Sequence, residues 1–338
     1  MVMGLGGKKI LVTGGAGFVG SHIVESLVAQ GARVIVFDNI SSGKIENLKA
    51  VEDDVEVIRG NILDYKSLLE AYRGVDIISH QAAQLEIFNG IDNPSEDLKI
   101  NTIGTLNVLN AARESKVEKV VNASSACVYG QAQQIPQSEE HPTNPNWAYG
   151  VSKLAAEKYC QIYRDYFGIP IVSLRYGIVY GEREWFGRVL TMFIKRVMNS
   201  EPPVIFGDGK QIRDFIHVTD LVQMHNLCIE RDEVDGKVFN VATSMGTTVG
   251  ELANIVIECS GNSLSPLYED LKEGAFSQYI PNRRRIPAEL RSMVLSIDKA
   301  KKELGWSPKI PLKQGIVKEM NWASQNPGSW EIEGIVHI

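Results

Sequence analysis

The residues with the clearest capacity for chemistry are Tyr149 and Lys153, which lie four positions apart. In a helix this spacing places both side chains on one face. A tyrosine hydroxyl has an ordinary pKa of about 10, and a nearby ammonium favours its ionised form. Such a phenol could exchange a proton with a substrate hydroxyl near neutral pH. The pair alone is weak evidence, because exposed helices often carry tyrosine and lysine at this spacing.

Two serines, Ser124 and Ser125, follow the apolar run 119–123, which predicts a buried strand. We expect both serines just after the carboxyl end of that strand. A hydroxyl there could hydrogen-bond the same substrate oxygen as Tyr149. The alternative is an ordinary serine-rich turn, and the tyrosine–lysine pair makes us favour a site role for Ser125.

The start of the chain predicts an element that could hold a nucleotide beside these residues. Residues 10–13 form a short apolar run, typical of a strand buried on both faces. Gly14, Gly17 and Gly20 follow at intervals of three, before an amphipathic helical pattern. Glycines in such a turn let the backbone approach a pyrophosphate, and a helix N-terminus attracts phosphate. The pattern therefore predicts a dinucleotide site.

A second buried-strand pattern, 33–38, ends in Asp38, 18 residues after Gly20. A carboxylate there can accept hydrogen bonds from ribose hydroxyls and repels a 2′-phosphate. Asp38 therefore favours NAD over NADP, and a solvated aspartate at a strand end is the weaker alternative.

Strand and helix patterns alternate through the first half of the chain. Further strands are predicted at 55–58, 75–79, 119–123 and 169–174, and helices at 65–72, 94–114 and 147–167. Parallel strands need crossover connections, which helices supply. We predict an α/β fold: a Rossmann-type doubly wound parallel sheet with a smaller mixed C-terminal substrate lobe. The NAD-binding domain is predicted at 1–176, with later contributions from about 216–241, and 177–338 is mainly the substrate lobe.

Composition describes an ordinary globular chain of 338 residues, with 44% hydrophobic and 22% charged residues. The net charge of −6 gives no indication of nucleic acid or an anionic membrane as a partner. No run approaches the roughly 20 apolar residues of a membrane span, and the start has no signal-peptide pattern. The four cysteines show neither paired nor metal-ligand spacing. We predict a cytoplasmic protein without disulfide or metal.

Several motifs occur in a fixed order along nearly the whole chain: Thr13-Gly-Gly-Ala-Gly-Phe-Val-Gly20, Asp38-Asn39, His80-Gln-Ala-Ala83, Asn101-Thr-Ile-Gly-Thr105, Ala123-Ser-Ser-Ala-Cys-Val-Tyr-Gly130, Tyr149-Gly-Val-Ser-Lys153, Phe206-Gly-Asp-Gly-Lys-Gln-Ile-Arg-Asp-Phe-Ile-His-Val218 and Leu304-Gly-Trp306. This set resembles the extended short-chain dehydrogenase/reductase family. Within that family it is most similar to nucleotide-sugar 4-epimerases of the UDP-glucose type.

The resemblance implies roles for individual residues. Ser125, Tyr149 and Lys153 match the catalytic residues of the family. The residues implied to bind NAD are Gly14, Gly17, Phe18, Val19, Asp38, Asn39, Ser42, Gly43, Asn61, Ile62, Gln81, Ala82, Ala83, Asn101, Ala123, Tyr149, Lys153 and Tyr176. Those implied to bind substrate are Gln84, Ser125, Tyr149, Ile178, Val189, Arg213 and Arg285. Arg213 matches an arginine that binds the substrate diphosphate, for which a guanidinium is well suited.

Ala126 and Cys127 distinguish between the reactions of the family. Dehydratases of the family carry Asp-Glu at these places, and decarboxylases carry an acid at the place of Cys127. Without that acid, oxidation and re-reduction at one carbon remain, which is epimerisation. A dehydratase or decarboxylase of the same family is the alternative. A non-enzymatic NAD-binding regulator is a third hypothesis, disfavoured because it has no need of Ser125, Tyr149 and Lys153 together.

The chain departs from the epimerase pattern near the expected nucleotide end. Ile178 stands where epimerases usually have an asparagine, and Ile286 where they usually have an arginine. Either Arg285 or Arg291 could reach the same phosphate. Uronic-acid epimerases tend to have an arginine near Trp185, so a tryptophan favours a neutral sugar, although Arg183 and Arg188 are close in sequence.

The resemblance also implies a homodimer. The helices predicted at 94–114 and 147–167 would pair with those of a second copy as a four-helix interface. The sequence itself shows only that these helices are long and amphipathic.

Overall fold

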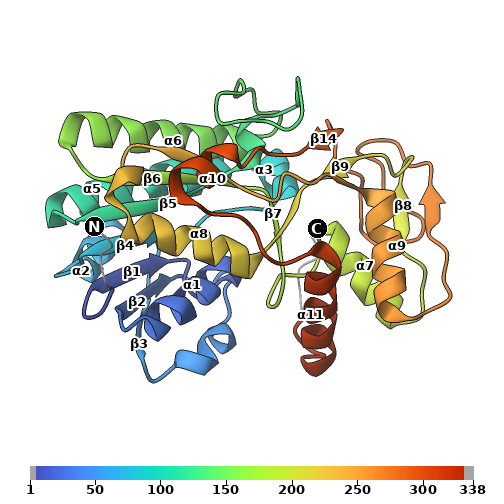
Figure 1. Cartoon of the computed structure of the whole chain (residues 1–338), viewed down its shortest axis with the longest axis horizontal. Helices are drawn as coiled ribbons and strands as arrows, with labels where there is room; N and C mark the ends of the chain where they lie inside the picture. The colour runs from blue at the N-terminus through green and yellow to red at the C-terminus, as the bar shows by residue number, and fades with distance from the viewer. Residues whose placement is uncertain (1–4, 331–338) are drawn as a thin grey trace.

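Seven parallel strands form the central sheet of the computed structural model, which describes residues 5–330 (Figure 1). The strand order is β11-β6-β5-β4-β1-β2-β3. Their bounds are β1 (Lys9–Thr13), β2 (Arg33–Asp38), β3 (Val55–Arg59), β4 (Ile77–His80), β5 (Lys119–Ser125), β6 (Ile171–Tyr176) and β11 (Val238–Val241). This is the strand order of the doubly wound dinucleotide-binding fold, extended by β11 at one edge. The predicted fold class is confirmed.

Alternation of side chains along β1 builds the two helical layers on the sheet. Ile10 and Val12 belong to one core, with α1 (Phe18–Ala29) and α8 (Val218–Glu230). Leu11 lies in the core on the opposite face, which is covered by three helices. These are α2 (Tyr65–Ala71), α5 (Gly104–Ser115) and α6 (Ala148–Phe167). Figure 1 shows α5 and α6 on the side of the sheet away from α8.

From β1 the chain builds the sheet outward through β2 and β3, and from β4 it builds the sheet outward in the opposite direction. The strand order therefore reverses between β1 and β4, which are paired neighbours. In such sheets the loops after these two strands diverge and leave a crevice that binds ligands. Gly14 follows β1 and Ala82 follows β4. A Cβ on Gly14 would lie 2.7 Å from the backbone nitrogen of Ala82, so the two loops are in contact at the base of the crevice.

The smaller lobe consists of short strands and helices after β6. The remaining elements after β6 are β7 (Ile178–Tyr180), α7 (Val189–Met198), β8 (Val204–Phe206), β9 (Ile212–Arg213), β10 (Phe215–His217), β12 (Thr247–Thr248), α9 (Val249–Ser260), β13 (Leu267–Glu269), β14 (Ser292–Met293), α10 (Asp298–Leu304) and α11 (Leu312–Gln325). Of these, α10 packs against β11 of the central sheet. A separate core joins α7, α9 and α11 through Phe193, Leu252 and Ile316. Figure 1 places this lobe at the end of the molecule opposite β3.

Two sequence-based expectations about elements differ from the structure. The helix expected at 94–114 is divided into α4 (Pro94–Leu98), a π-helical segment η2 (Lys99–Ile103) and α5. Ser124 and Ser125 do not follow β5 but are its last two residues, because they pair with Arg175 and Tyr176 of β6. The remaining short helices are η1 (Ile45–Val51), α3 (Ile87–Asp92), η3 (Ala126–Val128) and η4 (Asp232–Val234).

Two ion pairs are among the polar contacts that join the smaller lobe to the sheet and its helices. Arg183 donates to both carboxylate oxygens of Glu25 in α1, at 2.7 and 2.8 Å, and to the carbonyl of Asn47 at 2.7 Å. In the second pair Arg284 donates to Asp92 of α3 at 2.7 Å. The first contact is largely buried, whereas the Asp92 side chain is 55% exposed.

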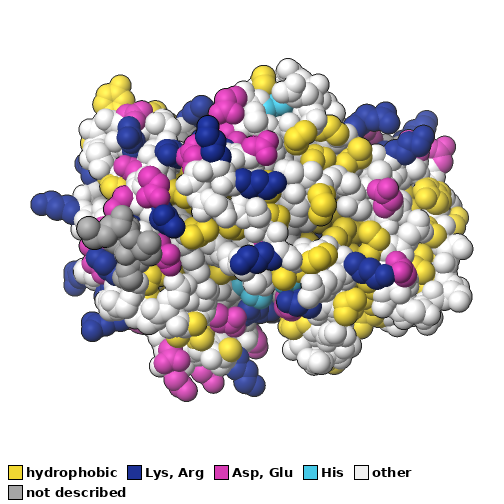
Figure 2. Space-filling model, in the orientation of Figure 1, with side chains coloured by type: hydrophobic (Ala, Val, Ile, Leu, Met, Phe, Trp, Pro, Cys, Tyr) yellow, Lys and Arg dark blue, Asp and Glu magenta, His cyan; other side chains and the backbone are white. Residues whose placement is uncertain are grey.

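On the face seen in Figure 2, basic and acidic side chains are interspersed. Within residues 5–330 no helix is long and apolar enough to cross a membrane. The same residues hold no group of three or more His, Cys, Asp or Glu side chains arranged for a metal ion, and the four cysteines are free thiols. The start of the chain, from which no signal peptide is predicted, lies partly outside the described residues.

Candidate active site

Ser125 lies where β5 ends and η3 begins. Its hydroxyl accepts a hydrogen bond from the backbone nitrogen of Cys127 at 3.2 Å and so caps η3. The strand pairing sets Ser125 opposite Tyr176. The hydroxyl is therefore held at the carboxyl edge of the sheet, where this fold binds its ligands.

Tyr149 and Lys153 occupy the first turns of α6, beside Ser125. Burial raises the pKa of the Tyr149 phenol above its ordinary value, and the hydroxyl of Ser125 and the charge of Arg188 lower it in part. In the protein without a bound ligand, the phenol of Tyr149 is therefore not ionised near neutral pH, contrary to the expectation from the sequence. The physical reason is desolvation, which disfavours the phenolate more than the neighbouring groups favour it.

Lys153 is only 4% exposed. Burial lowers the pKa of its ammonium to about 8, although the nearby Asp97 and Glu157 carboxylates act in the opposite direction. No side chain or carbonyl in the described part of the chain accepts a hydrogen bond from this ammonium. A nearly buried donor without an acceptor fits a ligand hydroxyl, such as those of a ribose.

The π-helical segment η2 places Asn101 between the loop after β4 and α6. Asn101 exchanges two hydrogen bonds of 2.9 Å with the backbone of Gln84, and its amide also donates to Ser152 at 3.1 Å. Asp97 accepts from Gln84 at 3.1 Å and from the hydroxyl of Ser152. Short π-helical segments within α-helices often occur at functional sites. Here the segment fixes Gln84 relative to the helix of Tyr149 and Lys153.

The residues expected at the adenosine end follow β1, β2 and β3. Asp38, at the end of β2, accepts from the backbone nitrogens of Ala16 at 3.0 Å and Ile40 at 2.8 Å. This ties the glycine turn to the strand end that would face the ribose. Gly17 caps α1, which begins with Phe18 and Val19. Asn39 and Ser42, after β2, are exposed, and Gly43 is buried; Asn61, after β3, is exposed, and Ile62 is buried.

Tyr176 and Gln81, which are expected to bind NAD, belong to a chain of hydrogen bonds that reaches α8. Tyr176 donates to Gln81 at 3.1 Å, and the amide of Gln81 donates to Ser79 at 3.1 Å. The hydroxyl of Ser79 lies 2.8 Å from Nε2 of His225 in α8. Burial lowers the pKa of His225 to about 4, so the imidazole is neutral near neutral pH. Ala82 and Ala83 continue the same loop, and Ala123 lies in β5.

Two arginines expected to bind the diphosphate meet at one carboxylate. Nη2 of Arg213 lies 3.6 Å from Oε1 of Glu289, and Nε of Arg285 donates to Oε2 of the same residue at 3.0 Å. Arg291 is exposed, and its backbone carbonyl accepts from Ile212 at 2.8 Å. The structure thus brings the guanidinium groups of Arg213 and Arg285 to the same carboxylate.

The remaining expected substrate residues border the smaller lobe. Ile178 begins β7 and pairs with Phe215, and Val189 begins α7, which Arg188 caps. Arg188 lies near the carboxylate of Glu184 at 3.5 Å and faces the ring of Trp185 at 5.7 Å. Arg183 is engaged by Glu25, as described above.

Sequence reasoning missed Glu289, Asp97 and His225 as parts of this site. Glu289 lies within the departure from the epimerase pattern near Ile286, where no role was expected for the acid. Asp97 lies four residues before Asn101, a spacing that brings side chains to one helical face. For His225 the sequence carries no signal, because its partner Ser79 lies on a distant strand.

A doubly wound sheet, a glycine turn at its switch point and a Ser-Tyr-Lys cluster at its carboxyl edge define an NAD-dependent short-chain dehydrogenase/reductase. The model of the NAD dependent epimerase/dehydratase family matches residues 10–242. The chain belongs to this family. The resemblance found in the sequence and the expectation of NAD as cofactor are confirmed.

Similar proteins extend over almost the whole chain. A putative UDP-glucose 4-epimerase of Methanocaldococcus jannaschii is 37% identical over 322 residues, covering 94% of this chain and 99% of the relative. The crystal structure of UDP-glucose 4-epimerase with UDP-glucose from Thermotoga maritima matches with a TM-score of 0.86 and 32% identity, covering 94% of this chain and 99% of that one. A human dTDP-D-glucose 4,6-dehydratase is 29% identical, covering 96% and 92%. The prediction of an NAD-dependent enzyme of the epimerase type is confirmed.

The residues present fit NAD. Gly14 leaves space that a Cβ would fill, Asp38 is fixed at the end of β2, and the Lys153 residue is only 4% exposed. The turn could therefore receive the pyrophosphate, the carboxylate the adenosine ribose, and the ammonium the second ribose.

Proposed function

We propose that this protein is an NAD-dependent nucleotide-sugar 4-epimerase that acts on UDP-glucose, UDP-galactose or a related UDP-sugar. The observation that carries the proposal is the cluster of Ser125, Tyr149 and Lys153 beside Ala126 and Cys127. The cluster can serve oxidation and reduction at one sugar carbon. Neither residue after Ser125 is an acid that could move a proton at the neighbouring carbon.

In the proposed reaction NAD supplies hydride transfer to and from C4 of the sugar, through a transient 4-keto sugar. Tyr149 takes the proton of the 4-hydroxyl and later returns it to the oxygen. Ser125 hydrogen-bonds the same oxygen and orients it toward the phenol. The positive charge of Lys153 favours the phenolate. Arg213 and Arg285 bind the diphosphate, so the sugar can turn while the nucleotide stays bound.

A dehydratase or decarboxylase activity is the second candidate, and the similarity to dTDP-D-glucose 4,6-dehydratase gives it some support. It is disfavoured at Cys127. Burial raises the pKa of this thiol above its ordinary value, so the group is neutral near neutral pH and a poor base.

A neutral sugar is supported by the partners of the nearby arginines. Arg183 is bound to Glu25, and Arg188 lies near Glu184. The charges of Arg188 and Arg283 also act on the partly buried Glu86. A sugar carboxylate would have to compete with these protein carboxylates, so we expect UDP-glucuronate to be a poor substrate.

The first test is incubation of the purified protein with UDP-glucose, UDP-N-acetylglucosamine and UDP-glucuronate separately, without added NAD. Product NMR should show a C4-inverted sugar from a neutral donor, because NAD is carried by the protein and regenerated. A 4-keto-6-deoxy product would support the dehydratase instead. Bound NAD with no product from these donors would contradict the proposed UDP-sugar substrates.

We also propose that the protein is a homodimer formed through α6 and α4. A stripe of apolar side chains on α6 is exposed: Val151, Tyr159, Ile162 and Tyr166. Leu98 at the end of α4 and Ile103 of η2 are also 48% and 45% exposed. An exposed apolar stripe on a long helix is a typical interface, and a symmetric pair is the usual way to cover it.

A further inference from the structure

A buried ion pair joins α6 to β6 behind the candidate active site. Arg175 donates to Glu157 through Nε at 3.0 Å and through Nη2 at 2.6 Å, and both side chains are at most 5% exposed. The hydroxyl of Ser124 donates to the same carboxylate at 2.7 Å. Glu157 thus accepts three hydrogen bonds from two strands that neighbour each other in the sheet.

These three residues stand directly beside the groups of the proposed reaction. Ser124 precedes Ser125 in β5 and pairs with Arg175, while Ser125 pairs with Tyr176. Glu157 follows Lys153 by four residues, so both lie on one face of α6. The unit of Ser124, Glu157 and Arg175 therefore fixes the strand end that carries Ser125 to the helix that carries Lys153.

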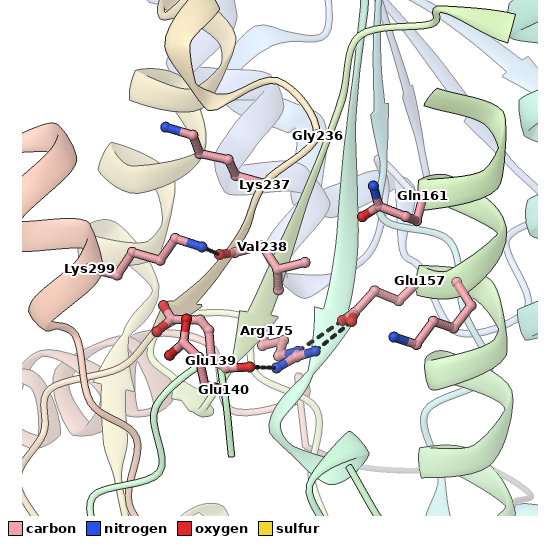
Figure 3. A pocket seen from close by; sticks show the side chains of 10 residues that line it. Glu139, Glu140, Glu157, Gln161, Arg175, Gly236, Lys237, Val238 and Lys299 are labelled. Atoms are coloured by element: carbon pink, nitrogen blue, oxygen red, sulfur yellow. Dashed lines mark hydrogen bonds and ion pairs between the residues drawn. The ribbon is translucent and has the colours of Figure 1, made fainter. Parts of the chain in front are cut away.

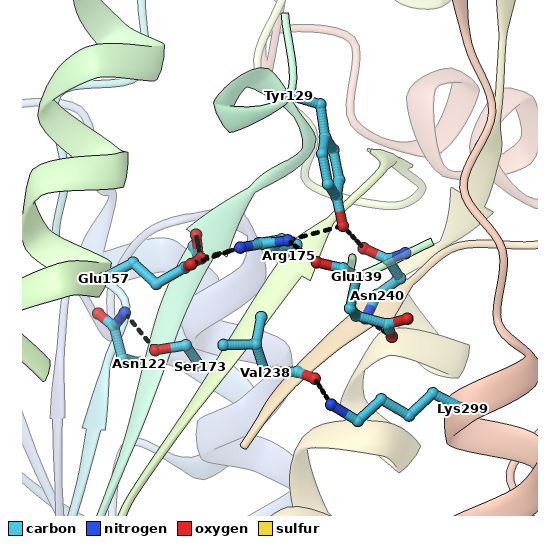
Figure 4. Close-up of polar contacts among 10 residues, drawn as sticks. Asn122, Tyr129, Glu139, Glu157, Ser173, Arg175, Val238, Asn240 and Lys299 are labelled. Atoms are coloured by element: carbon cyan, nitrogen blue, oxygen red, sulfur yellow. Dashed lines mark hydrogen bonds and ion pairs between the residues drawn. The ribbon is translucent and has the colours of Figure 1, made fainter. Parts of the chain in front are cut away.

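The guanidinium of Arg175 also binds the segment that follows η3. Arg175 donates to the hydroxyl of Tyr129 at 2.9 Å and to the carbonyl of Glu139 at 3.1 Å. Tyr129 donates to Asn240 of β11 at 2.6 Å. Figure 4 shows these groups in line, from Glu157 through Arg175 and Tyr129 to Asn240. Three strands and α6 are thus tied by one polar network.

A cavity of about 270 Å³ opens on this network, between α6, the start of β11 and α10. Figure 3 shows Glu157 and Arg175 among its lining side chains, with Lys237 and Lys299 farther along the wall. Water in such a polar cavity can solvate a charge that loses its partner. A change at Glu157 is therefore more tolerable here than in a sealed core.

We propose that Glu157 is a positioning residue, which fixes Lys153 and Ser125 relative to each other through Arg175 and Ser124; this inference rests on the proposed function. The carboxylate does not touch the reacting atoms. Its main effect is to hold β5, β6 and α6 in fixed positions through its hydrogen bonds. A second effect is that its negative charge stabilises the ammonium of Lys153. The other titratable groups near Lys153 are Asp97 in α4, His80 in β4 and Cys160 in α6.

The direction of the charge effect follows from the neighbours of Lys153. Burial lowers the pKa of the ammonium to about 8, and Glu157 raises it against burial. Loss of the Glu157 charge should lower this pKa further. The ammonium would then be lost at a lower pH, so the alkaline limit of activity and of NAD binding should move down.

The test uses three variants of the whole chain. Glu157→Gln removes the charge, and the double variant Glu157→Met and Arg175→Met replaces the pair by apolar side chains of similar volume, which often preserves stability. Glu303→Gln is the matched control, since its carboxylate pairs with Lys237 at the cavity at 2.7 Å without linking to the catalytic elements. For the first two variants we expect kcat to fall by roughly tenfold with KM nearly unchanged. The control should match the wild type.

The double variant separates positioning from stability. A folded double variant, by circular dichroism and thermal melting, with reduced kcat supports the inference. A double variant with the kcat and pH profile of the wild type overturns it, because a role in stability alone would then account for the pair.

A second measurement needs no sugar. We expect the alkaline decline of NAD affinity, followed by calorimetry from pH 6 to 10, to start at a lower pH in Glu157→Gln than in the wild type. An unchanged NAD profile in Glu157→Gln overturns the effect of the Glu157 charge on Lys153, and kcat of the double variant decides the positioning role. A wild type that epimerises no nucleotide sugar overturns the proposed function, and the NAD profile then still decides whether Glu157 acts on Lys153.

Discussion

Tyr149 carries the phenol that the proposed reaction needs, and its ring is partly buried against Ser125 and Cys127. Tyr149→Phe removes one oxygen and keeps the ring in place. We expect kcat to fall by at least about 100-fold, because the general acid and base is lost. NAD content should remain that of the wild type, measured by absorbance after denaturation.

A matched control is Tyr159→Phe, a change of the same kind on the exposed side of the same helix. It should leave kcat unchanged. Substantial epimerase activity in Tyr149→Phe would contradict the assignment, whereas loss of both activity and NAD would point to damage of the site.

Individual residues of the site differ in how far the sequence could predict them. Tyr149, Lys153 and Ser125 were predictable because a local spacing and a strand end bring them together. The pairing of Arg175 with Glu157 was not, because the two residues are 18 positions apart on different elements and meet only through tertiary packing. The raised pKa of Tyr149 could not be predicted from the sequence either, because desolvation depends on all the groups that surround the phenol in the folded protein.

Among the elements, the turn from β1 to α1 depends most on a missing side chain. Gly14 has φ of +67°, and a Cβ there would meet the backbone of Ala82 at 2.7 Å. Gly168, which caps the end of α6, has φ of +68° but no atom within 4 Å of a Cβ. A left-handed conformation alone costs a non-glycine residue about 1 kcal/mol.

We therefore expect Gly14→Ala to lower the free energy of unfolding by at least about 1 kcal/mol more than Gly168→Ala does. Gly14→Ala should also be isolated with little NAD, because the two loops must separate where the pyrophosphate binds. Urea denaturation and the NAD content of both variants check this. Equal effects of the two changes would mean that the close approach of the loops does not matter.

The elements that the sequence predicted best are the buried strands, because short continuous apolar runs between turn residues are typical of strands covered on both faces. The strand at 33–38 has the predicted bounds. The division of 94–114 was not predictable, because the π-helical segment leaves the apolar pattern intact and shows only in backbone bonds such as that from the nitrogen of Gly104 to the carbonyl of Lys99, five residues earlier. The end of β5 was placed too early, because its pairing with β6 continues through two serines.

For the whole molecule, the exposed stripe on α6 predicts association. Tyr166 is 79% exposed, and Tyr166→Glu would bring a charge into the proposed interface. We expect the wild type to be a dimer and Tyr166→Glu to be largely monomeric, by size-exclusion chromatography with light scattering. Tyr268→Glu, at a 54% exposed tyrosine of the smaller lobe, is the control and should remain dimeric. A monomeric wild type would contradict the proposal.

Two ion pairs between the smaller lobe and the helices on the sheet are unequal. Arg183 is held by Glu25 and a backbone carbonyl and is only 12% exposed, whereas the Arg284–Asp92 pair is open to water and is therefore weak. We expect the Arg284–Asp92 pair to separate more readily than the Arg183–Glu25 pair. Exchange of a ligand past the basic turn 283–285 would then disturb only the weaker pair, while Arg183 stays bound to Glu25 of α1.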